Sequence, residues 1–590
     1  MKFPPKYLLL IIVALAFVLR VYKSDSYGVF LDEKYTLVIS QGIVMEGANQ
    51  KDVFFTPGKR YFTPKEFWKE KTFNDFIEAN IRGDIGNSPA YYGVFWLWTK
   101  LFGLSDFSVR FLSVLFSTAI VALVYVFVKR HFRSESLALI SASITAFEPF
   151  FVAYSHQARN YSMSFFLTLL ATHLFLLVVR PRSSSTSEKT SAWLYLAYGL
   201  VFVLSLLSHY LTLTVFLCHG LYALFFLRPF KRWIPFVATA LVGIGLVALW
   251  FVFGGGKYTF QTLAYQAKLY GELAQTHPYD NPFAIILPAT FANVAIKSAP
   301  LWADLLMFTN GLGQIEFLGL RNILLSLVLG GVAAWCLHRY LTSQKYPAVY
   351  LAAFALLLVT GMPFYTVPKL QYVVLAAAPS FLYLLAGFLK NHTAETPRSL
   401  LWFMAMLAIV PTLFLVIMSF KNNHTYGLTQ RYSGFSFPYS ILFVAMMLKQ
   451  FWKLPAAPKA ILGVVLGIQL YFIGNLLVRI YQDRDPKYTY FVNPRGPNPY
   501  MTTAGKIVEQ YAPGDTILYP SVKLHPRDEI ERTHSPYAIQ DAQLTNLYLP
   551  KDAEYYQRMD TTQTDKVILI KGATGKREVL FDFEGRKYRY

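Results

Sequence analysis

Two neighbouring acids, Asp32 and Glu33, lie in the stretch YGVFLDEKYT at residues 27–36, a few residues after the first apolar segment of the chain. Charged residues at the end of a membrane helix are often only solvated. A carboxylate can also act as a general base, which accelerates a reaction by about 10²–10⁴-fold. The other polar residues of the chain help to decide between these two interpretations.

Further polar groups stand at the ends of apolar runs that are far apart in the sequence. The stretches AYSHQARNYS, LSHYLT and FYTVPKLQYVV supply His156, Gln157, Arg159, Tyr161, His209, Tyr210, Lys369 and Tyr372. Taken singly, the cations fit contacts with phospholipid headgroups, and the tyrosines fit an interfacial aromatic belt. Ionisable groups at membrane depth are costly and usually functional. If these groups share one membrane face with the two acids, they form a candidate site.

Glu148 lies within the apolar run ITAFEPFFVAYS, about two helical turns before His156. The following residue, Pro149, has no N–H and leaves a backbone carbonyl without its helical partner. This pattern predicts a break in the helix that can be polar, so we expect Glu148 near the site. Asp84 and Asp304, in the polar segments between apolar runs, are weaker candidates.

One reaction fits carboxylates beside fixed cations at a membrane face, namely transfer of a sugar from a lipid-linked phosphate to a hydroxyl group. Negative charge grows on the phosphate as the glycosidic bond breaks, and Arg or Lys beside it lowers the barrier. A carboxylate can accept the proton of the acceptor hydroxyl. One base without a required nucleophile predicts a single displacement with inversion. The sequence indicates no cofactor and no metal ligands, although a divalent metal remains compatible with it.

The composition predicts that membrane helices position these residues. The chain has 590 residues, of which 54% are hydrophobic and 15% charged, whereas a soluble protein carries about 25% charged residues. Apolar runs of about 18–20 residues recur along most of it, each long enough to cross a bilayer. Thirteen spans are predicted, at residues 7–22, 108–128, 136–153, 162–179, 191–207, 211–227, 233–253, 321–338, 348–362, 371–389, 399–419, 436–450 and 460–480.

The positive charges set the predicted orientation. The formal charge is +21, but Lys and Arg cluster in short loops such as KRHFR at 129–133, RPRSSSTSEK at 180–189 and RPFKR at 228–232. This positive-inside pattern needs no nucleic acid as partner. It predicts a multi-pass protein of the inner (cytoplasmic) membrane with a cytoplasmic N-terminus and a first span that is retained. The polar segments 23–107, 254–320 and 420–435 then share the external side.

Residues 481–590 differ in composition from the rest and are predicted to form a small extracytoplasmic α/β domain. DTILYPS and DKVILIKG favour strands, and MTTAGKIVEQYA favours a helix. Residues 1–480 form the predicted transmembrane domain, with interfacial helices at YFTPKEFWKE and YYGVFWLWTKLFG in the first external loop. The two cysteines, Cys218 and Cys336, lie in separate apolar runs, so no disulfide framework is expected.

Several of these motifs resemble the GT-C superfamily of integral-membrane glycosyltransferases, in particular the protein O-mannosyltransferase-like and aminoarabinose-transferase-like families. The resemblance is carried by the DE pair after the first span, by SPAYYGVFWLWTKLFGLSDFSVRFLSVLFS at 88–117, and by AYSHQARNY, SHY and PKLQYVVLAAAPSFLYLLAG. It implies an all-α GT-C fold of about thirteen transmembrane helices with an external domain. It also implies a polyprenyl-phosphate sugar donor, with Asp32 as catalytic base, Glu33 beside it as the second catalytic residue, and Arg159 and Tyr161 at the donor phosphate.

Four positions depart from the family pattern. Gln157 stands where the family usually has Glu, and Ser88 stands where aminoarabinose transferases place a phosphate-binding Lys. Leu370 or Gln371 replaces the usual Arg before Tyr372, with Lys369 as a substitute. Glu148 stands where a small polar residue commonly precedes the proline.

The leading interpretation is a glycosyltransferase of the external face, whose acceptor is a lipid, a glycan or a protein. Its runner-up is an oligosaccharide ligase that uses a pyrophosphate-linked donor. A flippase or transporter of lipid-linked sugars is the alternative from another class, but transporters tend to place their site near the midplane between repeated halves, and no repeat is visible. A non-catalytic membrane scaffold is the third alternative.

Overall fold

A computed structural model describes most of the chain. The described residues are 4–45, 59–84, 86–179, 192–228, 230–281, 285–307, 315–365, 369–392, 397–484, 494–523, 537–585 and 588. The basic stretch RPRSSSTSEK at 180–189 and residues 46–58 of the first external loop lie outside them.

Each predicted span coincides with a helix or a helix pair. The helices are α1 (Pro5–Val21), α6 (Asp106–Phe132), α7 (Glu135–Phe147) with α8 (Pro149–Ser155), α9 (Tyr161–Val179), α10 (Ala192–Ser208), α11 (Leu213–Phe226), α12 (Phe230–Phe253), α15 (Ile315–Thr342), α16 (Pro347–Thr360), α17 (Lys369–His392), α18 (Arg398–Asn422), α20 (Phe437–Phe451) and α21 (Ala456–Tyr481). Within the described residues, eight helices are long and apolar enough to cross a membrane, or nine if the bent pair α7–α8 is one span. The polytopic helical architecture is confirmed, whereas the number thirteen is not.

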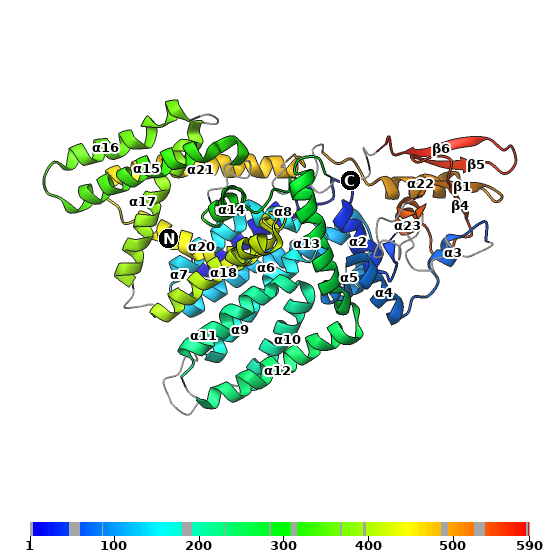
Figure 1. Ribbon diagram of the computed structural model, residues 1–590, viewed down its shortest axis with the longest axis horizontal. Helices are drawn as coiled ribbons and strands as arrows, with labels where there is room; N and C mark the ends of the chain where they lie inside the picture. Colours follow the sequence, from blue (N-terminus) through cyan, green and yellow to red (C-terminus); the bar gives the residue numbers. More distant parts are fainter. Residues whose placement is uncertain are drawn as a thin grey trace.

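Shorter helices connect these spans. The segment predicted as the first external loop forms α2 (Leu31–Ser40), α3 (Pro64–Phe67), α4 (Phe73–Asp84) and α5 (Pro89–Phe102), and the later segments form η3 (Tyr210–Thr212), η4 (Gly255–Tyr258), α13 (Thr259–Thr276), α14 (Phe291–Leu305), η6 (Met362–Phe364), α19 (Gln430–Ser433) and η7 (Gly434–Ser436). The predicted helix in YFTPKEFWKE is limited to the four residues of α3, while YYGVFWLWTKLFG lies in α5. Figure 1 shows α2, α4 and α5 between the helical bundle on the left and the C-terminal domain on the right.

The C-terminal domain combines α22 (Pro499–Gln510) and α23 (Gln540–Asn546) with a four-stranded sheet of order β4-β1-β5-β6. Strand β1 (Thr516–Pro520) is parallel to β4 (Tyr556–Asp560) and antiparallel to β5 (Lys566–Ile570), which pairs with β6 (Arg577–Asp582). A short pair, β2 (Val522–Lys523) and β3 (Tyr537–Ala538), lies apart from this sheet. The predicted strands β1 and β5 and the predicted helix α22 are present, whereas β4 and β6 were not predicted.

The predicted break at Pro149 bends α7 against α8 by 52°. Glu148 is buried at this break, and its Oε1 accepts a hydrogen bond from the N–H of Phe150 at 3.4 Å. The carbonyls of Thr145 and Ala146, which would normally accept from residues 149 and 150, instead accept from the guanidinium of Arg20 at 3.0 Å each. Arg20, fully buried in α1, therefore satisfies the two carbonyls that the break frees.

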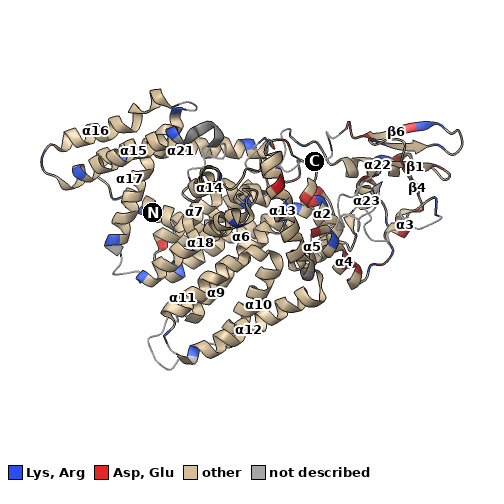
Figure 2. Cartoon of the chain, in the orientation of Figure 1, with Lys and Arg blue, Asp and Glu red and all other residues tan. Residues whose placement is uncertain are grey.

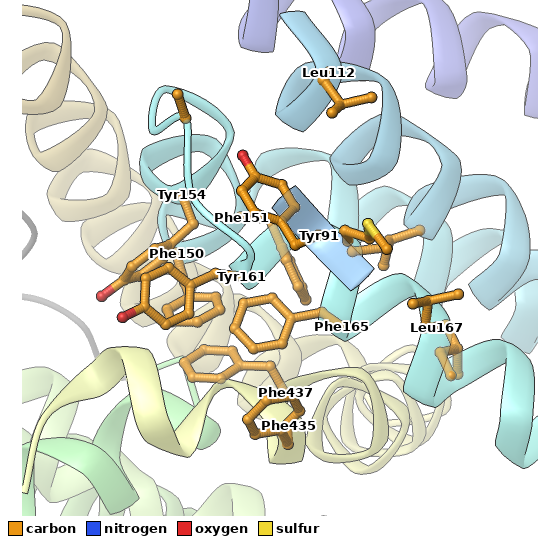
Figure 3. Close-up of a cluster of buried hydrophobic side chains, with 14 of the residues drawn as sticks. Tyr91, Leu112, Phe150, Phe151, Tyr154, Tyr161, Phe165, Leu167, Phe435 and Phe437 are labelled. Atoms are coloured by element: carbon orange, nitrogen blue, oxygen red, sulfur yellow. The ribbon is translucent and has the colours of Figure 1, made fainter. Parts of the chain in front are cut away.

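An aromatic cluster holds the turn after α18 against α8 and α9 (Figure 3). The rings of Phe150 and Phe437 stack with centroids 4.1 Å apart, and Phe165 meets Phe435 edge-on at 5.1 Å. A Cβ on Gly434 would lie 2.2 Å from Cζ of Phe165. Only glycine fits this close approach, so η7 and the adjoining α19 are fixed beside the α8–α9 turn.

Lys and Arg are drawn at the ends of α12, α15 and α17 that lie away from the C-terminal domain, while both basic and acidic residues are drawn near α2 and in that domain (Figure 2). The orientation itself stays a prediction.

We expect Arg20→Gln to destabilise the protein, because the shorter amide cannot satisfy the Thr145 and Ala146 carbonyls together with Ser117. Each buried acceptor left without a donor costs about 1–3 kcal/mol. Thermal unfolding in detergent measures the effect. Arg398→Gln, at an exposed arginine in the first turn of α18, is the control, and equal melting temperatures for the two variants would contradict this role of Arg20.

Candidate active site

Three consecutive charges in the first turn of α2 point to three different parts of the molecule, because successive helical residues are rotated by about 100°. Asp32 faces Arg431 of α19, and Glu33 faces Arg110 of α6. The ammonium of Lys34 lies 5.2 Å from the ring centroid of Tyr500 in the C-terminal domain. One helical turn therefore joins the first external loop to three separate segments.

Glu33 is fully buried, and both of its oxygens are bound. Oε1 accepts from Arg110 Nε at 2.8 Å and from the backbone N–H of Ala158 at 2.8 Å. Oε2 accepts from Arg110 Nη2 at 2.7 Å and from the N–H of Phe30, which starts α2, at 3.1 Å. Burial alone raises the pKa of Glu33, but the charge and hydrogen bonds of Arg110 outweigh it, so the net pKa lies below its usual range.

Arg110 is bound as completely as its partner. Its remaining N–H groups donate to the carbonyls of Ser24, Tyr27 and Gly28, at 2.5–3.0 Å. These contacts hold residues 24–28, which follow α1, against the N-terminal part of α6. With no side-chain atom left for a substrate, the Glu33–Arg110 pair fits a positioning role better than the catalytic role predicted for Glu33.

Asp32 differs sharply from its neighbour. Its side chain is 30% exposed, and Oδ2 lies 3.3 Å from Nη1 of Arg431. Arg431 is only 9% exposed, and the Gly434 packing described above fixes its backbone. Asp32 is therefore an accessible carboxylate beside a nearly buried cation.

Arg159 lies on the other side of Asp32 and gathers residues from three elements. Its Nη1 donates to the backbone carbonyl of Asp32 at 3.1 Å, and to Thr36 Oγ1 and Tyr92 OH at 3.3 Å each. Its Nη2 lies 3.9 Å from Oδ2 of Asp84, which also accepts from Tyr92 OH at 2.6 Å. The predicted proximity of Asp32 and Arg159 is thus present, and the weaker candidate Asp84 joins them.

The environment of Asp84 favours its protonated form relative to an ordinary aspartate. Burial is the largest influence and raises the pKa of Asp84, while the charge of Arg159 and the hydrogen bond from Tyr92 lower it, with a net rise. Asp84 is also less accessible than Asp32, with 19% of its side chain exposed. Of these two aspartates, Asp32 is therefore the more accessible to an acceptor hydroxyl.

Asn160 joins the turns that surround Arg159. Its Nδ2 donates to Ser88 Oγ at 2.7 Å and to the carbonyl of Ser208 at 2.6 Å. Ser88 adopts the left-handed backbone conformation, with φ of 58°. Ser88, which replaces the family's phosphate-binding lysine, is thus a buried turn residue. The α4–α5 turn and the start of η3 are brought beside the site.

Tyr161 and His209 line the aromatic side of the site. Their ring centroids are 5.8 Å apart, and His209 also packs against Tyr432 and Phe435. Nδ1 of His209 accepts from the N–H of Leu211. Burial, with a smaller contribution from Arg159, lowers the pKa of His209 to about 3, so the imidazole is neutral at physiological pH. It can contribute shape and a hydrogen bond, but no fixed charge.

The structure does not bring every predicted residue to this cluster. His156 binds the carbonyl of Arg20 at 2.9 Å and packs on Tyr481, and burial lowers the pKa of His156 to about 3. Glu148 caps α8 within the bundle. Tyr210 donates to the carbonyl of Gly86, and so supports a turn beside the site.

Lys369 and Tyr372 lie in a different helical group. Tyr372 is fully buried in the core formed by α15, α16 and α17, where its hydroxyl donates to the carbonyl of Leu357 at 2.6 Å. Lys369 is exposed at the start of α17. Neither makes a described contact with Asp32, Arg159 or Arg431.

Sequence reasoning missed Arg431, Tyr92 and Thr36. Arg431 lies in the polar segment 420–435, which was assigned to the external side. This assignment could have indicated that Arg431 lies on the same face as Asp32. Thr36 lies one helical turn after Asp32, which predicts a shared helix face. Within the described part of the chain, no group of three or more His, Cys, Asp or Glu side chains could hold a metal ion.

Replacing Glu33 by Gln is expected to destabilise the folded state by about 3–5 kcal/mol at neutral pH, because Arg110 would be left as a buried charge without its counter-ion. Since the folded-state pKa of Glu33 is lowered, its contribution is present above the ordinary glutamate value of 4.5 and is lost as the pH falls through the folded-state value. The difference in melting temperature between wild type and Glu33→Gln should therefore shrink on acidification. Glu554→Gln, at an exposed ion pair with Lys65, is the control, and a pH-independent difference would contradict the assignment.

Comparison with known proteins identifies one matching family. The family model of dolichyl-phosphate-mannose-protein mannosyltransferases matches residues 87–252, a region that contains Tyr92, Arg110, Arg159 and His209. No curated protein matches the chain in sequence.

Several solved structures show a weak likeness. The apo oligosaccharyltransferase of Archaeoglobus fulgidus is 13% identical, covers 87% of this chain and 59% of its own, and gives a TM-score of 0.42. ArnT from Cupriavidus metallidurans in the apo state is 12% identical. The match covers 95% of this chain and 86% of ArnT, with a TM-score of 0.38. For the structure of ArnT bound to undecaprenyl phosphate the identity is 13%, the match covers 91% of this chain and 84% of ArnT, and the TM-score is 0.36.

At these TM-scores the structural likenesses carry no argument about the site, and the chain spans only 59% of the archaeal enzyme's length. The family match carries more weight, because it covers the helices that supply Arg110 and Arg159. The resemblance to the protein O-mannosyltransferase-like family that the motifs predicted is thereby supported over residues 87–252.

Proposed function

We propose that the protein transfers a sugar from a polyprenyl-phosphate-linked donor to a hydroxyl acceptor, with Asp32 as the general base. The observation that carries the proposal is the partly exposed Asp32, whose carboxylate lies against Arg431 and whose backbone carbonyl accepts a hydrogen bond from Arg159. The match to a family named for a lipid-phosphate-linked mannose donor supports the donor class. The identity of the sugar is left open.

The proposed reaction is a single displacement. The acceptor oxygen bonds to the anomeric carbon as the bond between that carbon and the phosphate oxygen breaks. Asp32 takes the hydroxyl proton, and the bonding electrons leave with the polyprenyl phosphate. Attack opposite the leaving group inverts the anomeric configuration.

Arg431 and Arg159 suit the leaving phosphate for different reasons. The guanidinium of Arg431 lies against the accessible carboxylate of Asp32. A phosphate that binds there can accept hydrogen bonds from Arg431 while Arg431 still contacts Asp32. Arg159 is held from three sides by Tyr92, Thr36 and Asp84, so its charge needs little reorganisation during the reaction. Fixed donors of this kind are worth about 10²–10³-fold in rate when one is removed.

The site also suggests what holds the sugar and the lipid. Tyr161, His209 and Tyr432 form an aromatic wall beside Asp32 that suits the apolar face of a sugar ring. We infer that the donor enters from the external leaflet of the cytoplasmic membrane. In this arrangement the C-terminal domain is extracytoplasmic and the acceptor is an envelope lipid, polysaccharide or protein.

We expect Asp32→Asn to lower transfer by about 10²–10⁴-fold, because the amide cannot accept the acceptor's proton. Binding of polyprenyl phosphate should persist, since both arginines remain. Transfer is measured as the release of polyprenyl phosphate from polyprenyl-phosphate mannose and related sugar donors. The assay is carried out without a gradient across the membrane. Asp25→Asn, at an exposed acid of the same loop, is the matched control. Near-normal turnover in Asp32→Asn would remove the base role, and gradient-dependent movement of intact donor would favour a transporter.

Arg431→Gln and Arg159→Ala should each slow transfer by about 10²–10³-fold and weaken binding of polyprenyl phosphate. Lys421→Gln, at an exposed cation at the end of α18, should change neither. Titration of labelled polyprenyl phosphate in nanodiscs gives the affinities. Unchanged donor kinetics in Arg159→Ala would reduce Arg159 to a structural contact of Asp84 and Tyr92.

A further inference from the structure

The segment that leads into α2 is bound directly by the start of the C-terminal domain. Arg495 donates from Nη1 to the carbonyl of Gly28 at 3.0 Å, and the N–H of Gly28 donates to the carbonyl of Gly496 at 2.8 Å. A Cβ on Gly28 would lie 3.0 Å from Cα of Asn498. Two backbone segments, residues 27–30 and 495–498, therefore lie in direct contact, and glycine permits their approach.

The guanidinium of Arg495 is itself rigidly held. Its Nε and Nη2 donate to the two oxygens of Asp483 at 2.9 and 3.0 Å, in a bidentate pair. Nη1 also lies 3.5 Å from Oε2 of Glu33. The side chain is 9% exposed and that of Asp483 is 2% exposed. The end of α21 is thus linked through Arg495 to the buried acid next to Asp32.

Other contacts of the same domain hold both ends of α2. Lys34 lies over the ring of Tyr500, and beyond the C-terminal end of α2 the carbonyl of Val44 accepts from Gln543 Nε2 at 2.7 Å. Asn498 donates to Asp106, which begins α6. Only Asp32 of the three charges in the first turn of α2 faces away from these supports, toward Arg431.

A general base must be held close to its productive position, because a displacement of about 1 Å can cost about 10²-fold in rate. In this chain the supports of α2 are supplied from residues more than 400 positions away in the sequence. We propose that the C-terminal domain is a structural part of the active site, with Arg495 as a positioning residue that acts on Asp32 through Gly28 and Glu33. The inference rests on the proposed role of Asp32 as base.

The test compares Arg495→Gln, Arg495→Lys and the control Arg577→Gln in the full chain in nanodiscs. Arg577 is 60% exposed on β6, in the same domain. Two properties are measured: kcat and KM for polyprenyl-phosphate mannose or the related donor that the wild type uses, and hydrogen exchange of the amides of residues 31–41.

In Arg495→Gln we expect kcat to fall by about 10²-fold with donor KM within about twofold of wild type, because the donor's arginine ligands stay in place. Exchange of the α2 amides should accelerate by about tenfold or more while that of α6 and α9 is unchanged. Arg495→Lys keeps the charge but loses the bidentate fork, so both properties should be intermediate. Arg577→Gln should match wild type.

A kcat within twofold of wild type in Arg495→Gln, or unchanged exchange of α2, would overturn the inference. Accelerated exchange throughout the chain would also overturn it, since Arg495 would then serve general stability. If Arg495→Gln does not fold, Arg495→Lys decides by the same criteria. If the wild type transfers no sugar from any donor tried, the proposed function fails, and the exchange measurement alone still decides whether Arg495 holds α2.

Discussion

The buried ion pair between Glu33 and Arg110 is the interaction on which the arrangement of the site depends. Every polar hydrogen of the Arg110 guanidinium has an acceptor, and both Glu33 oxygens have donors. A buried pair contributes little net stability unless it is fully hydrogen-bonded in this way. Because the same pair holds the N–H of Ala158 and the carbonyl of Gly28, it fixes the α8–α9 turn relative to the start of α2. Arg159 follows directly from that turn.

The two neighbouring acids have different roles, because Glu33 is structural and Asp32 is the proposed base. Asp32 and Glu33 have similar chemistry, but the rotation of the helix buries one and leaves the other at the accessible edge. Glu33 closes the N-terminus of α2 by accepting from Phe30, which also places a negative charge at the positive end of the helix dipole. The contacts of Glu33 fix the first turn of α2. They therefore fix the position of Asp32, whose own carboxylate remains accessible.

The sequence predicted those features that are determined locally. Apolar run length located the helices, Pro149 located the bend, and the short strand-favouring runs DTILYPS and DKVILIKG located β1 and β5. Asp32 and Arg159 were predicted to converge because both stand at helix ends on one face, and they do. The assignment of residues 420–435 to the same side was a signal for Arg431 as well, but its close approach to Asp32 depends on the fit of Gly434 between Phe150 and Phe165. His156 and Tyr372 were expected at the site because both stand at helix ends on the predicted face. Their side chains instead pack elsewhere, His156 against Tyr481 and Tyr372 in the core of α15, α16 and α17.

Charges inside the helical bundle follow the same rule as those of the site. Arg20 would be very costly in an apolar environment, yet the break at Pro149 leaves two carbonyls that need donors, and Arg20 supplies them. The carbonyl of Arg20 in turn accepts from His156, two residues before Ala158. The helix break, the first span and the turn that carries Arg159 are therefore coupled through hydrogen bonds as well as through the apolar core that they share. A site built from several separate segments combines such directional contacts with close packing of the kind seen at Gly434, and both hold the helix ends relative to Asp32.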